Sequence, residues 1–179
     1  MNELAQAIRQ AIDVDLPDTG IRHVVVIGEV ATGKTTVAER IAAALPDVAA
    51  VQLLVSSNEM EDLSGRCGRK TMIPVNSAPP ASLVRDAASR DFDTLVVGDT
   101  SDENAETVLG AMGLGFHAPR DADPPRPSVI VCHRAVSRGD RPDPFMDRIR
   151  AEARGTIAVV RTVMARDTRV RSITSVQVL

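Results

Sequence analysis

The feature that most constrains this chain is the run Gly28–Thr35, GEVATGKT, which has the form G-x-x-x-x-G-K-T. It follows a short run of mostly β-branched residues, His23–Ile27, and precedes an alanine-rich segment, 34–45, that Pro46 ends. A continuous apolar run of this kind is typical of a strand buried on both faces, and the second segment has a helical pattern. The spacing therefore predicts a strand, a phosphate-binding loop and a helix in direct succession.

The chemistry of such a loop depends on its backbone and on a few side chains. Gly28 and Gly33 permit backbone conformations that a Cβ atom obstructs, so that N–H groups surround an anion at the positive end of the following helix. Lys34 supplies a charge for the β- and γ-phosphates, Thr35 a ligand for Mg²⁺, and Thr36 a hydrogen bond to the α-phosphate. We therefore predict that ATP and Mg²⁺ bind here. The predicted nucleotide-binding residues are Gly28, Glu29, Val30, Ala31, Thr32, Gly33, Lys34, Thr35 and Thr36.

The alternative is a chance occurrence of the motif in an ordinary loop, and the register of strand, loop and helix argues against it. Glu29 and Ala31 stand where many such loops carry glycine. An acidic side chain beside phosphate is compatible with binding only if it points away, so we expect Glu29 to face outward.

Asp99 is the second candidate site residue, and it follows an apolar run over Thr94–Val97. In P-loop proteins an acid at the carboxyl end of a neighbouring strand holds Mg²⁺, directly or through water. Ligands also gather at that edge of open α/β sheets. We predict that Thr35 and Asp99 are the metal-side residues. The alternative is that Asp99, with one of the three residues after it, caps the following helix.

Two further residues are candidates for catalysis. His133 ends the expected strand 129–132 at the same edge, where it would sense the γ-phosphate or polarise the attacking water; a histidine satisfied at a strand end is an equally good interpretation. Glu59 is a candidate base that orients water, and an acidic loop explains it equally well. The predicted catalytic set is Lys34, Asp99, His133 and Glu59. Glu61 and Asp62 share both interpretations with Glu59. The basic cluster Arg66, Arg69 and Lys70 could reach phosphate from a neighbouring subunit, but a solvated loop explains it better. Ordinary loop and core positions account for His117 and Cys132.

Strand and helix patterns alternate along the chain, which predicts an α/β fold with a mostly parallel central sheet flanked by helices. The expected strands are 23–27, 48–55, 94–97, 129–132, 156–163 and 170–178, and the expected helices are 4–12, 34–45, 81–89, 103–112 and 144–154. The last two strands should form a C-terminal antiparallel hairpin, and residues 56–74 should be loops with a small hairpin. We expect one domain over residues 1–179, with a helix and turn at 1–20.

Composition excludes several classes of function. A net charge of −3, three Phe and no Trp or Tyr argue against direct nucleic-acid binding by charge or by base stacking. No apolar run approaches the roughly 20 residues of a membrane helix, and the amphipathic N-terminus lacks the apolar core of a signal peptide. We therefore expect a cytoplasmic location. The two cysteines and three histidines are too scattered for a disulfide framework or a zinc motif.

The order of these motifs resembles the motor domain of type II and type IV secretion and pilus ATPases. The family's loop GGTGSGKTT is matched by Gly28–Thr36, and its segment LVRNALRMRPDRIVVGE is matched in spacing by Leu83–Asp99. A helix ending in LQAMNTGH is matched by Leu109–Phe116, and a strand ending in TLHA by Val131–Arg134.

The resemblance extends over the whole chain and has consequences for fold and function. It implies a RecA-like P-loop NTPase fold and Mg-dependent ATP hydrolysis coupled to movement in a homo-oligomer, which in the family is a hexamer. It also implies a membrane-embedded secretion or pilus machinery as partner, with the chain peripheral to the inner membrane. The family's N-terminal domain, which helps close the nucleotide site, is not expected here, because only residues 1–20 precede the first strand.

The chain departs from the family pattern at several positions that serve hydrolysis. The family's acid at the Asp99 position is usually glutamate, and its acidic pair at the end of the second strand is replaced by Val55-Ser56. An arginine, a histidine and a threonine of the family are replaced by Ser101, Phe116 and Val131.

Three functions remain open at this point. The first, which we favour, is an ATP-hydrolysing motor domain. The second is a divergent, non-hydrolysing nucleotide-binding module that regulates or scaffolds a larger assembly, because the departures leave the binding residues intact. The third is a small-molecule kinase on a P-loop scaffold, with Arg134, Arg138 and Arg141 as its arginine lid.

Overall fold

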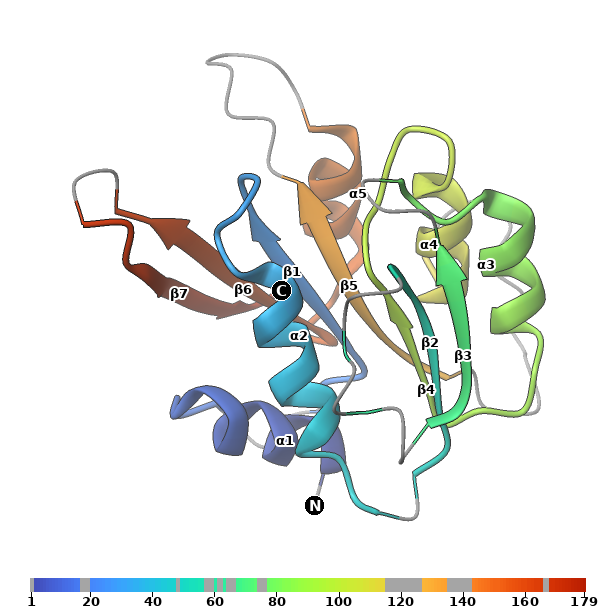
Figure 1. The fold of residues 1–179 in the computed structure, drawn as a ribbon, viewed down its shortest axis with the longest axis horizontal. Helices are drawn as coiled ribbons and strands as arrows, with labels where there is room; N and C mark the ends of the chain where they lie inside the picture. Colours follow the sequence, from blue (N-terminus) through green and yellow to red (C-terminus); the bar gives the residue numbers. More distant parts are fainter. Residues whose placement is uncertain are drawn as a thin grey trace.

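The computed structural model of the chain describes residues 2–16, 20–47, 49–56, 60, 63, 67–73, 77–114, 127–134, 143–165 and 168–179. Seven strands within these residues form one sheet, and helices flank it (Figure 1). The strands are β1 (His23–Gly28), β2 (Val51–Ser56), β3 (Cys67–Ile73), β4 (Thr94–Val97), β5 (Ser128–Arg134), β6 (Ile157–Met164) and β7 (Arg171–Val178). The helices are α1 (Glu3–Ile12), α2 (Lys34–Ala43), α3 (Ala81–Ala88), α4 (Ala105–Ala111) and α5 (Pro144–Glu152).

The strand order is β3-β2-β4-β5-β1-β6-β7, so β1 lies well inside the sheet. Neighbouring strands from β3 to β6 are parallel, whereas β7 runs antiparallel to β6. Every residue of β1, β2 and β4 is buried, as continuous apolar runs require when helices cover both faces. The predicted α/β fold, with a mostly parallel centre and a C-terminal antiparallel hairpin, is confirmed.

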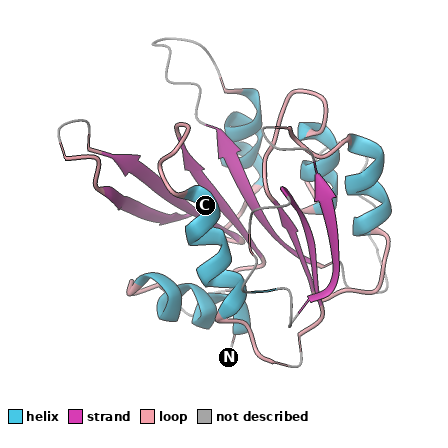
Figure 2. Cartoon of the chain, in the orientation of Figure 1, coloured by secondary structure: helices cyan, strands magenta, loops and turns pink. Residues whose placement is uncertain are grey.

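The helices cover the two faces of the sheet separately (Figures 1 and 2). α1 and α2 pack over one hydrophobic cluster, and α3, α4 and α5 pack over the other. Within β1, Val24 and Val26 belong to the first cluster, and Val25 and Ile27 to the second, because successive strand residues point to opposite faces. β1 is therefore held on both sides, and it carries the loop that follows it.

β3 differs from the expected loops and small hairpin at 56–74. It runs parallel to β2, with Val51 opposite Cys67 and Ser56 opposite Ile73, and a parallel pair needs a crossover rather than a tight turn. Its sequence, CGRKTMI, has little apolar pattern because it lies at the edge of the sheet, where glycine and basic residues are tolerated. An edge strand of this composition has the polarity of a loop, which explains why the sequence pattern was misleading.

The other expected elements are present, and all except the strand at 94–97 have shifted ends. The strand expected at 48–55 is observed as β2 from Val51 to Ser56, and the helix expected at 34–45 ends at Ala43. The helix expected at 103–112 begins only at Ala105, because Asn104 acts as its N-cap residue. None of the described helices is both long enough and apolar enough to span a bilayer.

The parallel strands end at one edge of the sheet, the upper edge in Figure 1. β1 ends at Gly28, β2 at Ser56 and β5 at Arg134, and Asp99 lies two residues beyond the end of β4. Open α/β sheets bind their ligands at this carboxyl edge, so the search for a site begins there.

Candidate functional site

The loop Gly28–Thr35, called the P-loop below, connects the end of β1 to α2. Gly33 is the N-cap residue of α2 and has a left-handed backbone with φ of 90°, which glycine adopts without steric strain. Ala31 is left-handed too, with φ of 65°, so the chain bends sharply before the helix begins. This bend leaves the positive N-terminal end of α2, with Lys34 and Thr35, at the carboxyl edge of the sheet.

The side chain of Lys34 turns back onto the P-loop. Its Nζ donates a hydrogen bond to the backbone O of Glu29 at 2.7 Å, and Oγ1 of Thr32 donates to the same oxygen at 2.9 Å. The two bonds tie the start of the P-loop to its end. The side chain of Glu29 is exposed, which is the outward orientation that an anion-binding loop requires.

The P-loop rests against β6. A Cβ atom at Gly28 would collide with Oγ1 of Thr162 and lie 2.6 Å from the backbone O of Thr162, so only glycine fits there. The Oγ1 atoms of Thr32 and Thr162 lie 2.8 Å apart, and because the hydroxyl of Thr32 donates to Glu29, the hydroxyl of Thr162 is the donor between the two. The backbone O of Ile27 lies 3.3 Å from Thr162 Oγ1. Both threonines are buried, so this contact fixes the P-loop to the C-terminal hairpin.

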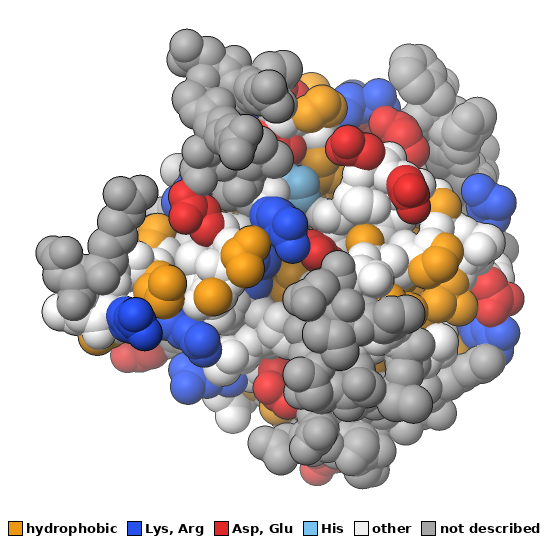
Figure 3. Space-filling model, turned by 45° about the horizontal axis from the view of Figure 1, so that its top comes forward, with side chains coloured by type: hydrophobic (Ala, Val, Ile, Leu, Met, Phe, Trp, Pro, Cys, Tyr) orange, Lys and Arg blue, Asp and Glu red, His pale blue; other side chains and the backbone are white. Residues whose placement is uncertain are grey.

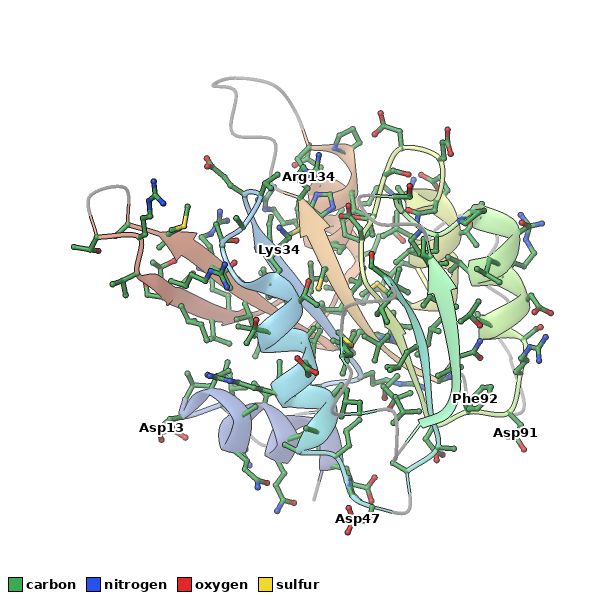
Figure 4. All side chains as sticks on the ribbon, viewed as in Figure 1. Asp13, Lys34, Asp47, Asp91, Phe92 and Arg134 are labelled. Carbon is green, nitrogen blue, oxygen red and sulfur yellow. The ribbon has the colours of Figure 1, made fainter. Side chains whose placement is uncertain are left out.

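A cavity of about 360 Å³ lies beside the P-loop at the carboxyl edge. Lys34 and Thr35 line it from the P-loop and α2, and Ser56 and Asp99 line it from the ends of β2 and β4. Arg134 of β5 also lines the cavity, and Figure 4 shows Lys34 and Arg134 on neighbouring elements at this edge. In Figure 3, which brings this edge forward, basic and acidic side chains meet near the centre of the face.

Asp99 is held at the cavity by its backbone and by neighbouring charges. Its Oδ1 accepts a hydrogen bond from the N–H of Thr100 at 2.9 Å, and its Oδ2 lies 3.9 Å from Nη2 of Arg134. Burial raises the pKa of Asp99 above its ordinary value, and Arg134, the Thr100 N–H, Lys34 and His133 oppose that rise. Because burial outweighs the neighbouring cations, the carboxylate would gain from a further cation in the cavity.

The geometry allows a metal-side role for Asp99. It does not cap α4, because the N-cap residue is Asn104, whose Oδ1 accepts from the N–H of Ser101 at 2.9 Å. Thr35 and Asp99 line the same cavity, and hydroxyl and carboxylate oxygens are the ligands that Mg²⁺ prefers. The described side chains form no cluster of three or more His, Cys, Asp or Glu residues that would hold a metal. A Mg²⁺ ion here would therefore need further oxygens from water or from a bound phosphate.

His133 is held by two neighbouring elements. Its Nδ1 lies 2.5 Å from Oγ1 of Thr100, and its Nε2 lies 2.9 Å from Oδ2 of Asp143, the N-cap residue of α5. Its ring stacks on Phe145 with the centroids 4.5 Å apart. His133 does not itself line the cavity, although its partner Thr100 follows Asp99 directly. The predicted catalytic role of His133 stays a prediction, and a structural role in orienting Thr100 is visible.

The structure brings Lys34, Thr35 and Asp99 to one cavity and places His133 next to it. Cys132 is fully buried in the core, as expected. Several sequence candidates lie outside the described residues or have side chains outside them: Glu59, Glu61, Asp62, Arg66, Arg69, Lys70, Phe116, His117, Arg138 and Arg141.

Arg171, the first residue of β7, is a cavity residue that the sequence does not single out. It belongs to no motif and is far from the P-loop along the chain. The only available indication is topological: a C-terminal hairpin placed next to β1 brings its residues to the P-loop. Arg134 likewise lines the cavity, although the sequence suggested it only as part of a kinase lid.

No known family model and no curated protein sequence matches this chain. Among solved structures it is similar to the VirB11 ATPase from the Brucella suis type IV secretion system, crystallised with sulphate, with a TM-score of 0.60 and 17% identity. The match covers 98% of this chain and 50% of VirB11, so the chain spans about half the length of that protein. An ATPase from the type III secretion system of pathogenic bacteria aligns with a TM-score of 0.37 and 14% identity, over 82% of this chain and 51% of that one. The likeness to VirB11 shows a shared fold, the RecA-like α/β fold that the family resemblance implies.

Proposed function

We propose that this chain binds a nucleoside triphosphate with Mg²⁺ and hydrolyses it as the motor domain of an oligomeric ATPase. The observation that carries the proposal is the cavity at which the P-loop, the start of α2 and the Asp99 carboxylate meet. The motif alone predicts a phosphate-binding loop. The fold brings a carboxylate that follows a different strand, β4, to the same cavity, which supports a metal site there.

The charge of the cavity supports a polyphosphate ligand. Its described lining holds three cationic side chains, Lys34, Arg134 and Arg171, and one carboxylate, Asp99. The protein as a whole has a net charge of −3, so this concentration of positive charge is local. Clefts lined by one sign of charge attract ligands of the opposite sign.

Each lining residue has a distinct task in the proposed reaction. The P-loop backbone and Lys34 would hold the β- and γ-phosphates, and Thr35 and Asp99 would hold Mg²⁺. The metal ion supplies neutralisation of the charge that develops on the phosphate oxygens. Arg134, at the end of β5, would stabilise the γ-phosphate side, a role that its position next to Asp99 supports.

Hydrolysis needs a water molecule in line with the γ-phosphate, and we keep His133 and Glu59 as the candidates for orienting it. The geometry supports an indirect action of His133, through the hydroxyl of Thr100 beside Asp99. Its second nitrogen contacts the carboxylate of Asp143, which would select the tautomer that donates from Nε2 and accepts at Nδ1.

The last part of the proposal concerns the coupling of ATP hydrolysis to a larger assembly. VirB11 is described as an ATPase of a type IV secretion system, and this chain shares its fold over about half of its length. From the family resemblance of the sequence, we propose that this chain works in a homo-oligomer, a hexamer in that family, and serves a secretion or pilus machinery.

Nucleotide binding without turnover is the second candidate, and a specific observation favours it. Ser56 and Val55 line the cavity at the end of β2, where the resemblance implies an acidic pair. Asp99 is the sole carboxylate among the lining residues that the structure describes. If Asp99 is used for the metal, the described lining offers no second acid to orient water.

Measuring nucleotide binding and phosphate release together separates the two candidates. We expect the wild type to bind Mg-ATP and to release phosphate, and Lys34→Ala to lose both. Arg40→Ala, at an exposed position in the last turn of the same helix, is the matched control and should behave like the wild type. Binding that depends on Lys34 without phosphate release would support the second candidate, and absence of any binding would reject both.

A further inference from the structure

Arg171 occupies an unusual place for a residue of the C-terminal hairpin. It begins β7, opposite Met164 of β6, and its side chain extends to the P-loop. The Cδ atom of Arg171 lies 3.2 Å from the position that a Cβ atom at Gly33 would occupy, with Cβ and Cγ of Arg171 at 3.8 and 3.9 Å. The aliphatic part of Arg171 therefore packs over Gly33, and Arg171 belongs to the lining of the cavity.

The hairpin holds this arginine in a defined position relative to the P-loop. Thr162 of β6 contacts Thr32 of the P-loop through their hydroxyl groups, 2.8 Å apart. Thr162 pairs with Ile173, two residues after Arg171 and on the same face of β7. The P-loop and the start of β7 are thus connected through one buried contact, which limits the movement of Arg171 away from Gly33.

The guanidinium group has no ion pair or hydrogen bond with any other residue that the structure describes. Other arginines at the surface differ in this respect: Arg148 and Arg150 each contact a carboxylate of α5. Arg171 is thus a cation at a cavity with its donors available to a ligand. An arginine fork matches the oxygens of a phosphate group.

The strand order tells which part of a nucleotide Arg171 would reach. Asp99 follows β4, which lies two strands from β1 on one side, and Arg171 begins β7, which lies two strands from β1 on the other. The carboxylate and Thr35 mark the metal side, where the β- and γ-phosphates meet Mg²⁺. The opposite side of the P-loop then faces the part of the nucleotide nearest the nucleoside.

We propose that Arg171 is a nucleotide-binding residue that contacts the α-phosphate of a nucleoside di- or triphosphate held by the P-loop. This inference rests on the proposed function and adds a residue and a position to it. The hairpin would then contribute directly to the ligand site, and Gly33 would have two roles: the left-handed turn before α2 and the space for the arginine side chain.

The test is a set of dissociation constants for Mg-ATP, Mg-ADP and Mg-pyrophosphate, measured by calorimetry on the wild type and four variants. Arg171→Ala should weaken ATP and ADP binding by the same factor, about tenfold, because both nucleotides carry the α-phosphate. Pyrophosphate has only two phosphate groups, which Lys34 would hold, and it has no third group in the place of the α-phosphate. Its dissociation constant should therefore change less than about twofold. Arg171→Lys should recover part of the lost affinity, since the ammonium group of lysine keeps the positive charge but not the two parallel N–H donors of the guanidinium group.

Arg161→Ala is the matched control, because Arg161 is an exposed arginine of the same hairpin and is not part of the cavity lining. It should bind all three ligands like the wild type. Lys34→Ala tests the proposed function itself and should lose binding of all three.

Three results for Arg171→Ala would overturn the inference: unchanged binding, a loss confined to ATP, or an equal loss for pyrophosphate. The proposed function would still stand if Lys34→Ala loses binding of all three ligands. Absence of nucleotide binding by the wild type would overturn both.

Discussion

The hydroxyl oxygens of Thr32 and Thr162 lie 2.8 Å apart, although the two residues are separated by 130 positions in the chain. Thr32 belongs to the P-loop and Thr162 to β6, so this contact attaches the phosphate-binding loop to the C-terminal hairpin. Gly28 lies against the same pair, because a Cβ atom there would be 2.5 Å from Thr32 Oγ1. The conformation of the P-loop therefore depends on a residue that no P-loop motif contains.

Replacing Thr162 by valine should weaken both folding and nucleotide binding. Valine keeps the shape but removes the hydroxyl, so Thr32 loses a buried partner and stability should fall by about 1 kcal/mol. Urea denaturation measures this change, and a double-mutant cycle with Thr32→Val isolates the pair. Thr174→Val, at an exposed hydroxyl of β7, should change stability little. Strictly additive effects of Thr32→Val and Thr162→Val would show that the hydroxyls do not interact.

Gly28 and Gly110 should respond in opposite ways to alanine. A methyl group at Gly28 meets the backbone O of Thr162 at 2.6 Å, which cannot move without disturbing the sheet, so Gly28→Ala should destabilise by at least about 2 kcal/mol. Gly110 lies in α4 with no atom within 4 Å of a new Cβ, so Gly110→Ala should stabilise by up to about 1 kcal/mol. Thermal unfolding of both variants checks the contrast. A tolerated Gly28→Ala would mean that β6 lies further from the P-loop than described.

The fold was largely predictable because its interior strands are short, continuous apolar runs. Thr94–Val97 was expected with its observed ends, and β1 was expected to within one residue, since a strand covered on both faces carries an unmistakable apolar signature. β3 was not predictable for the opposite reason. As an edge strand it contains Gly68, Arg69 and Lys70, and nothing in its own sequence shows that it pairs with β2.

The site was predictable only where it is local in the chain. Lys34 and Thr35 come from one contiguous motif, and Asp99 follows an apolar strand, so each carries its own indication. Arg171 and the contact between Thr162 and Thr32 depend on the order of strands in the sheet. That order is set by packing between distant segments, and hydrophobic periodicity does not encode it.

Asp99→Asn should be as stable as the wild type or more stable at neutral pH, and should bind Mg-ATP less well. The folded-state pKa of Asp99 is raised, chiefly by burial, so ionising this carboxyl is harder in the folded chain than in the unfolded one. The unfavourable contribution is therefore present above the folded pKa and disappears as the pH falls through it. The stability difference between the two proteins should shrink in acid, as denaturation at several pH values will show.

The metal-dependent part of binding gives the second readout for Asp99. The carboxylate must be ionised to hold Mg²⁺, so the Mg²⁺ dependence of ATP affinity should decline when acid protonates Asp99. Because the pKa of Asp99 is raised, this decline should begin at a higher pH than for an aspartate with an ordinary pKa. In Asp99→Asn this dependence should be weak at every pH. A wild-type level of Mg²⁺ dependence in the variant would assign the metal to another residue.

Asp143 combines two roles that its variants should separate. Its Oδ1 accepts from the N–H of Met146 at 3.1 Å as the N-cap of α5, and its Oδ2 contacts Nε2 of His133 at 2.9 Å. Asp143→Ala removes both contacts and should destabilise by about 1 kcal/mol or more, whereas Asp143→Asn keeps a good capping residue and should lose only a few tenths.

Asp143→Ala should also differ from the wild type in the imidazole itself. Of the two tautomers of the ring, a carboxylate at Nε2 and the hydroxyl of Thr100 at Nδ1 favour the one that carries its proton on Nε2. Nitrogen-15 NMR of the histidine ring should report that tautomer in the wild type and a mixture of tautomers in Asp143→Ala. If His133 keeps the same tautomer without the carboxylate, then Thr100 alone sets the tautomer of the ring. In that case Asp143 does not influence Thr100, the residue beside Asp99, through His133.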